Sequence, residues 1–150
     1  MSTYSIGLAW RRTTPDFDYK TFDRGHVWRL SEGQVVQGSS APEFSGDPKK
    51  SNPEEALLVA LASCHMLTFL TIAALKKLVV ESYDDQPVAE LGKNEKGKMM
   101  ITRLTLRPKV VFSGEAIPTP DAVDEIHRKA KENCFIGNSL LSPVVLESRY

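Results

Sequence analysis

Cysteine is scarce in this sequence of 150 residues: Cys64 and Cys134 are the only two. No Cys-x-x-Cys or His-x-x-x-His pair is present, and structural zinc sites need four ligands at such spacings. A zinc module that uses Cys64, His65 and Cys134 is therefore the less favoured alternative. A chain of this length buries a sizeable core without cross-links, so the two thiols are candidates for chemistry rather than for a structural disulfide.

The sequence also lacks net charge, a secretion signal and a long uninterrupted apolar run. Lysine plus arginine and aspartate plus glutamate both number 19, which argues against nucleic-acid and anionic-membrane partners. The first ten residues have no cationic start followed by an apolar run. The most apolar stretch, 56–75, is interrupted by Ser63, His65 and two threonines, so we expect no membrane-spanning helix. These absences predict one cytoplasmic domain over residues 1–150.

Most of the remaining sequence has the alternating pattern of β-strands. We expect strands over residues 4–10, 18–30 and 34–39, followed by a polar loop over 41–52. Further strands are expected over residues 79–91, 98–112 and 143–147.

Two segments have the end signals of helices. Asn52, Pro53 and Glu55 form a capping-box pattern that predicts a helix over 54–79, apolar nearly all round, which is typical of a helix buried between subunits or sheets. Thr119 and Pro120 predict a second helix that Gly137 ends, with one apolar stripe of Val123, Ile126, Ala130 and Cys134. The fold class is therefore α+β, with two main helices, one of them long and central, packed with antiparallel sheet.

The position of Cys64 in the first helix limits how its thiol can be activated. A reactive thiol needs a nearby cation or a helix N-terminus, and Cys64 lies in mid-helix. Its neighbours three and four residues away are Ala60, Leu61, Leu67 and Thr68. The cation must come from elsewhere in the fold, and the candidates are Arg11, Arg24 and Arg29. We expect His65 to be packed or hydrogen-bonded, and His127 to lie on a solvated face.

Several motifs together resemble the OsmC/Ohr family, the osmotically inducible and organic hydroperoxide resistance proteins. They are Asn52-Pro53-Glu54-Glu55, then Cys64-His65-Met66 ten residues after Glu54, and a late Cys134 followed by Ile136 and Ser139-Leu140. The resemblance spans essentially the whole chain. The organic hydroperoxide branch usually has proline after its second cysteine, whereas Phe135 stands here. The chain therefore looks closer to an OsmC-like branch.

The resemblance implies a thiol-dependent peroxidase that needs no metal or flavin cofactor. Cys64 would attack the peroxide and become a sulfenic acid, and Cys134 would resolve it as a disulfide. Arg24, which falls where the family keeps its arginine, would stabilise the thiolate, and Glu54 would hold Arg24. An external dithiol, typically a lipoylated protein, would reduce the disulfide. The alternative is a non-catalytic stress or ligand-binding protein with inert thiols.

Helix geometry adds an expectation about assembly. Glu54 lies about 15 Å from Cys64 along one helix, so we predict an intertwined homodimer in which Glu54 and Arg24 of one subunit reach Cys64 of the other. For the hydroperoxide substrate we expect contacts with His26, Leu61 and Met66, although each of these side chains has an ordinary packing role as its alternative.

Overall fold

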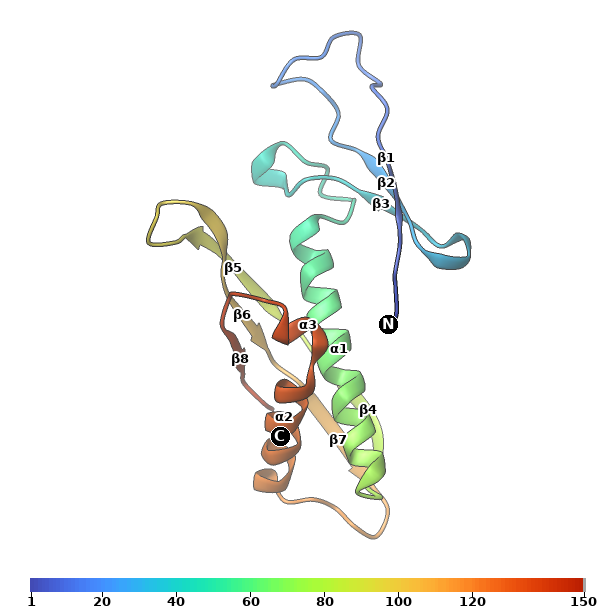
Figure 1. Cartoon of the computed structure of the whole chain (residues 1–150), viewed down its shortest axis with the longest axis vertical. Helices are drawn as coiled ribbons and strands as arrows, with labels where there is room; N and C mark the ends of the chain where they lie inside the picture. The colour runs from blue at the N-terminus through green and yellow to red at the C-terminus, as the bar shows by residue number, and fades with distance from the viewer. Residues whose placement is uncertain (150) are drawn as a thin grey trace. The chain divides into compact units, whose positions relative to one another are not determined.

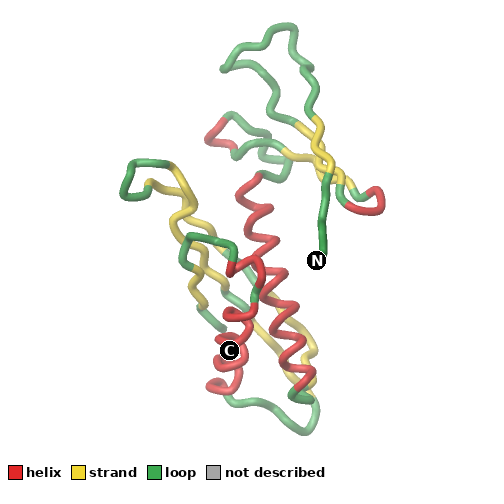
Figure 2. The backbone as a smooth tube through the Cα atoms, in the orientation of Figure 1, coloured by secondary structure: helices red, strands yellow, loops and turns green. Residues whose placement is uncertain are grey.

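The computed structural model describes residues 1–149. Contacts divide the chain into two compact units, residues 1–56 and residues from 57 onward. Each unit is described by itself, and the elements of both can be followed in Figures 1 and 2. The single domain over residues 1–150 stays a prediction.

The first unit is built around a three-stranded antiparallel sheet. Its order is β1 (Gly7–Ala9), β2 (His26–Arg29) and β3 (Val35–Gly38), with the short 3-10 helices η1 (Ser31–Gly33) and η2 (Pro42–Phe44). The three predicted strands are present, but each is shorter than its pattern indicated. The prediction of a strand from residue 18 is wrong, because the Phe22 N–H donates to the Asp18 carbonyl (2.9 Å) and the chain turns there.

Helix α1 (Pro53–Leu75) begins as predicted. The Asn52 side-chain oxygen accepts a hydrogen bond from the Glu55 N–H (2.8 Å), and the Glu55 carboxylate accepts one from the Asn52 N–H (3.1 Å). This is the reciprocal pairing of a capping box. The helix ends before the predicted residue 79, because Lys77 adopts a φ of 57° and the Leu78 N–H bonds back to the Ala73 carbonyl (3.0 Å).

The two long strands predicted for residues 79–91 and 98–112 are each broken into two. The breaks lie at Pro87 and Pro108, where the backbone has no N–H to donate to a sheet. The carboxylate of Asp85 accepts a hydrogen bond from the Arg107 N–H (2.7 Å), which ties the two breaks together. The four resulting strands are β4 (Val79–Asp84), β5 (Val88–Lys93), β6 (Met99–Leu106) and β7 (Lys109–Ser113).

These strands form two separate sheets in the second unit. β4 pairs with β7 in one sheet, and β5 pairs with β6 in the other, both antiparallel. The last strand, β8 (Val144–Leu146), adds to β6 in parallel, so that sheet is mixed rather than purely antiparallel.

Helix α2 (Pro120–Asn133) also begins as predicted, with the Thr119 hydroxyl accepting a hydrogen bond from the Ala122 N–H (3.3 Å). Cys134, predicted as part of this helix, leaves it with a ψ of 111° and caps a further short helix, α3 (Phe135–Asn138). Gly137 lies inside α3, so the prediction that it ends the second helix is wrong. Because the chain bends at Cys134, the direction of its side chain does not follow the helical periodicity of α2.

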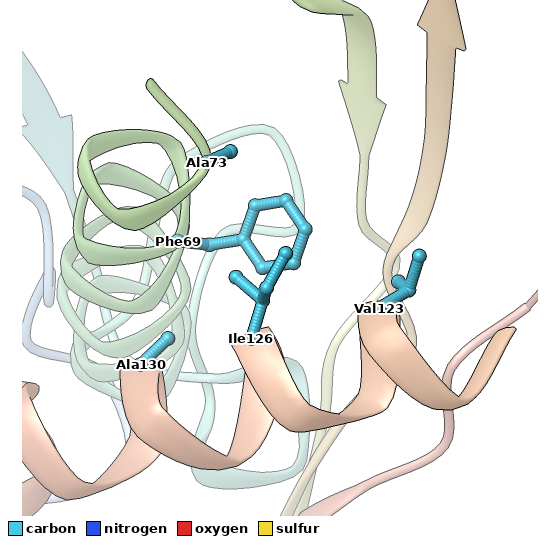
Figure 3. Packing of buried hydrophobic residues seen from close by; sticks show 5 residues of the cluster. All are labelled: Phe69, Ala73, Val123, Ile126 and Ala130. Atoms are coloured by element: carbon cyan, nitrogen blue, oxygen red, sulfur yellow. The ribbon is translucent and has the colours of Figure 1, made fainter. Parts of the chain in front are cut away.

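The core of the second unit lies between the helices and the sheets. Figure 3 shows Phe69 and Ala73 of α1 facing a row of α2 side chains, Val123, Ile126 and Ala130. Partly buried residues of β4 and β7 pack against this cluster. A second cluster joins Leu61 and Cys134 to Leu104 and Leu106 of β6. The predicted apolar stripe is therefore buried, and the α+β fold class is confirmed.

One face of α1 is left uncovered. Leu67 and Leu75 are 57% and 79% exposed. Among residues 1–149, α1 is the one helix long and apolar enough to cross a membrane, with a mean hydropathy of 2.0, and 22% of that window is buried. Core helices of soluble proteins meet the same criterion. Exposed apolar surface of this kind is typical of an interaction site.

Candidate active site

The two cysteines, 70 positions apart in the sequence, are brought together in the second unit. Cys64 lies in the middle of α1 and is half-buried, whereas Cys134, at the junction of α2 and α3, is 1% exposed. The sulfur of Cys134 accepts a hydrogen bond from the Gly137 N–H (3.3 Å). Cys64 packs against the buried cluster that contains Cys134, and the two thiols are close enough for each to affect the ionisation of the other. Residues at this bend therefore position a buried thiol against a more accessible one.

The environment of Cys134 keeps it protonated. Burial, and next the hydrogen bond with Cys64, raise its pKa to about 11, while the backbone N–H of Gly137 partly opposes them. Since the thiolate is the nucleophilic form of cysteine, Cys134 is poorly suited to a first attack at neutral pH. The arrangement favours first reaction at Cys64 and a second step at Cys134.

Cys64 opens on an apolar groove of about 710 Å³. Its walls come from one face of α1 and from the segment around α3, and they are Val59, Ala60, Ser63, Leu67, Thr68, Thr71, Asn133, Phe135 and Ile136. Most of these side chains present carbon to the groove, so a molecule with an alkyl or aryl body fits its chemistry.

The predicted substrate contacts on α1 fall elsewhere. Leu61 is buried and packs with Cys134, and it lines a smaller cavity on that side. Met66 is half-buried and lines neither cavity beside the cysteines. Residues two positions apart point to different sides of a helix, so Met66 does not share the face of Cys64. Leu67 and Thr71 lie three and seven residues after Cys64, on the same face of the helix, and both line the groove. This spacing in the sequence could have predicted them as groove residues.

Arg24, Glu54 and His26 belong to the first unit. The Arg24 guanidinium donates to the carbonyls of Phe22 and Tyr19 (both 2.6 Å) and stacks over the Phe22 ring at 3.8 Å. The predicted Arg24–Glu54 ion pair does not form among the described residues, because these groups occupy Arg24. A carboxylate oxygen of Glu54 is buried without a partner there, and a buried acceptor of this kind is expected to have one.

His26 and Arg24 line an aromatic pocket of about 280 Å³ with Trp10, Phe17, Phe22, Ser39, Ser40 and Pro53. Glycine at position 38 of β3 leaves room for the His26 ring. A Cβ at this position would lie only 2.7 Å from His26 Nε2, which is too close. Of the other two candidate activators, Arg29 and Arg11 are exposed, and Arg11 donates to the Trp10 carbonyl (2.8 Å). The choice among the three arginines stays a prediction.

Two buried histidines, His65 and His127, form a pair, and His65 lines the smaller cavity together with Cys134. His65 Nε2 and His127 Nδ1 are 3.1 Å apart, and the two ring planes lie at an angle of 9° with their centroids 5.4 Å apart. Burial lowers the pKa of each imidazole to about 4. The prediction for His65 is confirmed, whereas that for His127 is wrong, because it is 0% exposed. Its spacing of four from Val123 places it beside the apolar stripe, a signal that the charged neighbours obscured.

Metal ligation has no support in the geometry of the described part of the chain. Within residues 1–149, no three histidine, cysteine, aspartate or glutamate side chains come together as possible ligands. The zinc alternative built on Cys64, His65 and Cys134 therefore has no ligand set there, since structural zinc takes four ligands.

Comparison with known proteins agrees with this fold. The family model described as OsmC-like protein matches residues 46–149. An OsmC-like protein of unknown function from Vibrio cholerae is 42% identical, with a TM-score of 0.96 over 99% of this chain and 100% of that one. The uncharacterized protein YmaD of Bacillus subtilis is 28% identical over 128 residues, which cover 83% of this chain and 84% of YmaD.

A more distant structure shares the fold alone. The organic hydroperoxide resistance protein OhrB of Bacillus subtilis superposes with a TM-score of 0.72 at 16% identity, covering 99% of this chain and 98% of that one. The resemblance seen in the sequence motifs is thus confirmed by the family match and by the shared architecture. This chain belongs to the family of OsmC-like proteins.

Proposed function

We propose that this protein is a thiol-dependent peroxidase that reduces organic hydroperoxides in preference to hydrogen peroxide. One observation carries the proposal: Cys64, open to an apolar groove, packs against the cluster that contains the buried and protonated Cys134. Two thiols so placed can pass through a sulfenic acid and a disulfide without any cofactor. Proteins named for organic hydroperoxide resistance share this fold, from Legionella pneumophila and Bacillus subtilis.

The reaction divides between the two thiols. The Cys64 thiolate attacks the outer peroxide oxygen, the O–O bond breaks, and the alkoxide takes a proton and leaves as an alcohol. Cys64 is then a sulfenic acid. Cys134 attacks its sulfur, the S–O bond breaks, and water leaves as the disulfide forms. An external dithiol, for which we propose a lipoylated protein of the cytoplasm, returns both residues to thiols by exchange.

The groove accounts for the proposed preference among peroxides. An alkyl or aryl body that leaves water for the apolar walls gains about 25 cal/mol per Å² of buried surface, and hydrogen peroxide has no such body. Binding energy from the non-reacting part of a substrate supports the reaction at the peroxide end. The preference therefore follows from the walls around Cys64 rather than from the thiol itself.

The test is steady-state turnover with dihydrolipoamide as reductant. We expect cumene hydroperoxide to be consumed with a kcat/KM at least about tenfold above that for hydrogen peroxide, which corresponds to about 1.4 kcal/mol. An equal kcat/KM for the two peroxides would contradict the substrate assignment. Absence of turnover with either would overturn the peroxidase and favour the non-catalytic binding protein.

We propose that a second copy of the chain packs against the exposed apolar face of α1. Its exposed apolar face runs beside Cys64, and Glu54 has a buried oxygen without a partner among the described residues. A two-fold dimer is consistent with both observations, since a partner that covers the helix can also bring a donor to Glu54. We propose that Arg24 and Glu54 of the partner complete the site at Cys64.

Substitution of Leu67 with arginine tests this assembly. The wild-type protein is expected to be a dimer in buffer without detergent, and Leu67→Arg to be monomeric, because an unpaired buried charge costs about 3–5 kcal/mol. Light scattering after size exclusion measures the mass. Leu141→Arg, the same change at another exposed leucine, is the matched control and should remain a dimer. A wild-type monomer, or a wild type that needs detergent to stay in solution, would refute the proposed dimer.

A further inference from the structure

We propose that His65 is the general base that accepts the proton of Cys134 when the disulfide forms, and that His127 positions it. The inference deepens the proposed function and rests on its two-cysteine cycle. The juxtaposition that carries it is a small cavity, distinct from the groove at Cys64, that His65 and Cys134 line together.

The cavity is large enough for water and much smaller than the groove at Cys64. Its volume is about 120 Å³, and none of its lining residues is shared with the groove. Its walls are Leu61, His65, Lys131, Cys134, Gly137, Asn138, Ser142 and Val144. A water molecule occupies roughly 30 Å³ in the liquid, so a few waters fit. A single water can carry a proton from the Cys134 sulfur to the His65 imidazole.

The hydrogen bond between the two histidines leaves one nitrogen of His65 for this role. His65 Nε2 faces His127 Nδ1 at 3.1 Å, and within residues 1–149 the nitrogen of this pair that is buried without a hydrogen-bond partner is His127 Nε2. In the tautomer that the proposal requires, His65 donates from Nε2 and keeps its lone pair on Nδ1. The hydrogen bond joins the rings edge to edge, with their planes 9° apart, and holds the His65 imidazole in place, which makes His127 a positioning residue.

The groups around the pair keep His65 neutral at physiological pH. Burial, and next the charge of Lys131 on α2, lower the pKa of His65 to about 4. From α2, Asp124 acts in the opposite direction on His127, and from β4 the Tyr83 ring lies 6.2 Å from His127 with its own pKa raised by burial. A neutral imidazole has a free lone pair, whereas Cys134 must lose its proton to react.

The proton of Cys134 passes to His65 and then to the departing oxygen. The Cys134 sulfur bonds to the Cys64 sulfur as its proton moves to His65 Nδ1 through water. The S–O bond of the sulfenic acid breaks, and the departing hydroxide takes the proton back from the imidazolium to leave as water. Cys134 is oxidised and the sulfenic sulfur is reduced to the level of a disulfide. The proton moves as the S–S bond forms, so no free Cys134 thiolate accumulates.

A reaction without peroxide isolates this step. Dithiobis-nitrobenzoate, an aromatic disulfide, reacts first at the more accessible Cys64 and releases one coloured thiolate. Attack by Cys134 on the mixed disulfide then releases the second, so two phases of colour report the two thiols in a stopped-flow instrument. Peroxide turnover is measured separately, so a protein that is no peroxidase still reports on His65.

His65→Gln is the diagnostic variant, because the glutamine amide nitrogen replaces Nε2 toward His127 while Nδ1 is lost. In this variant we expect the rate of the second phase to fall about 100-fold at pH 7. That rate should increase with pH, because hydroxide replaces His65 as the base. The rate of the first phase should be unchanged. Lys131→Met, which removes the titratable side chain of the cavity other than His65 and Cys134, should keep the wild-type second phase. A slow second phase in Lys131→Met with a normal one in His65→Gln would assign the role to Lys131 and overturn the proposal.

The wild-type protein supplies a test that needs no variant to fold. With His65 as the base, the second phase should be nearly independent of pH between pH 6 and pH 9. If free Cys134 thiolate were the reactant, the rate would rise about tenfold per pH unit towards the high pKa of that thiol. Such a rise in the wild type would rule out His65 as the base.

Discussion

Cys64→Ser will abolish the reduction of organic hydroperoxides, with a loss of more than about 1,000-fold in turnover. A serine hydroxyl is not ionised at neutral pH and cannot form a sulfenic acid, so the first step of the cycle has no substitute. Consumption of cumene hydroperoxide with dihydrolipoamide, followed beside the wild type, measures the effect. The fold should be intact, since Cys64 is only half-buried.

Cys134→Ser is the partner variant, and it separates attack from resolution. It should consume one equivalent of hydroperoxide per subunit and then stop, with Cys64 held as a sulfenic acid. A sulfenic-acid probe such as dimedone, detected by mass spectrometry, should label Cys64 in Cys134→Ser and leave Cys64→Ser unlabelled. Sustained turnover by Cys64→Ser, or wild-type turnover by Cys134→Ser, would contradict the two-cysteine cycle.

Acid is expected to destabilise this protein through the His65–His127 pair. Burial holds the pKa of both imidazoles at about 4, against an ordinary value of 6.5. The unfolded chain therefore binds more protons than the folded one between these values, and stability falls as the pH falls. The contribution is complete above about pH 6.5 and is lost progressively towards pH 4. Between pH 7 and pH 5 it amounts to about 2 kcal/mol for one imidazole.

Urea unfolding at pH 7 and pH 5 measures this loss. The double variant His65→Gln, His127→Asn removes both titrating rings, so its stability should fall less than that of the wild type over the same interval. His26→Gln changes the one other histidine, which is half-buried in the first unit, and should match the wild type. Carboxylates that titrate in this range are common to all three proteins and cancel in the comparison. Equal losses in all three would show that the pair does not sense pH.

Features whose physical basis is local were predictable from the sequence. The starts of α1 and α2 are set by hydrogen bonds between residues three apart, at Asn52 and Thr119, and such pairs are visible in any short window. The apolar stripe of α2 follows from helical periodicity. The family was recognisable because the Asn-Pro-Glu motif, the ten-residue offset to Cys64 and the distant Cys134 occur together.

Features that depend on distant partners were not predictable in this way. The breaks at Pro87 and Pro108 show as single residues in the sequence, but the assignment of β4 and β5 to different sheets depends on β7 and β6. His127 has charged sequence neighbours, yet it is buried because α1 brings His65 and Phe69 against it. Local polarity predicted exposure, and tertiary packing decided burial.

The starts of the helices, the α+β class, the family and the two thiols as reactive candidates follow from the amino-acid sequence, because capping, periodicity and motif spacing act within short segments. Three further features emerge from the folded chain: Cys134 leaves α2 to meet Cys64, an apolar groove opens on one thiol and a small cavity on the other, and His65 pairs with His127. Each of these features depends on contacts between residues far apart in the chain. The pattern of residues within a short segment does not show which distant residues it will contact.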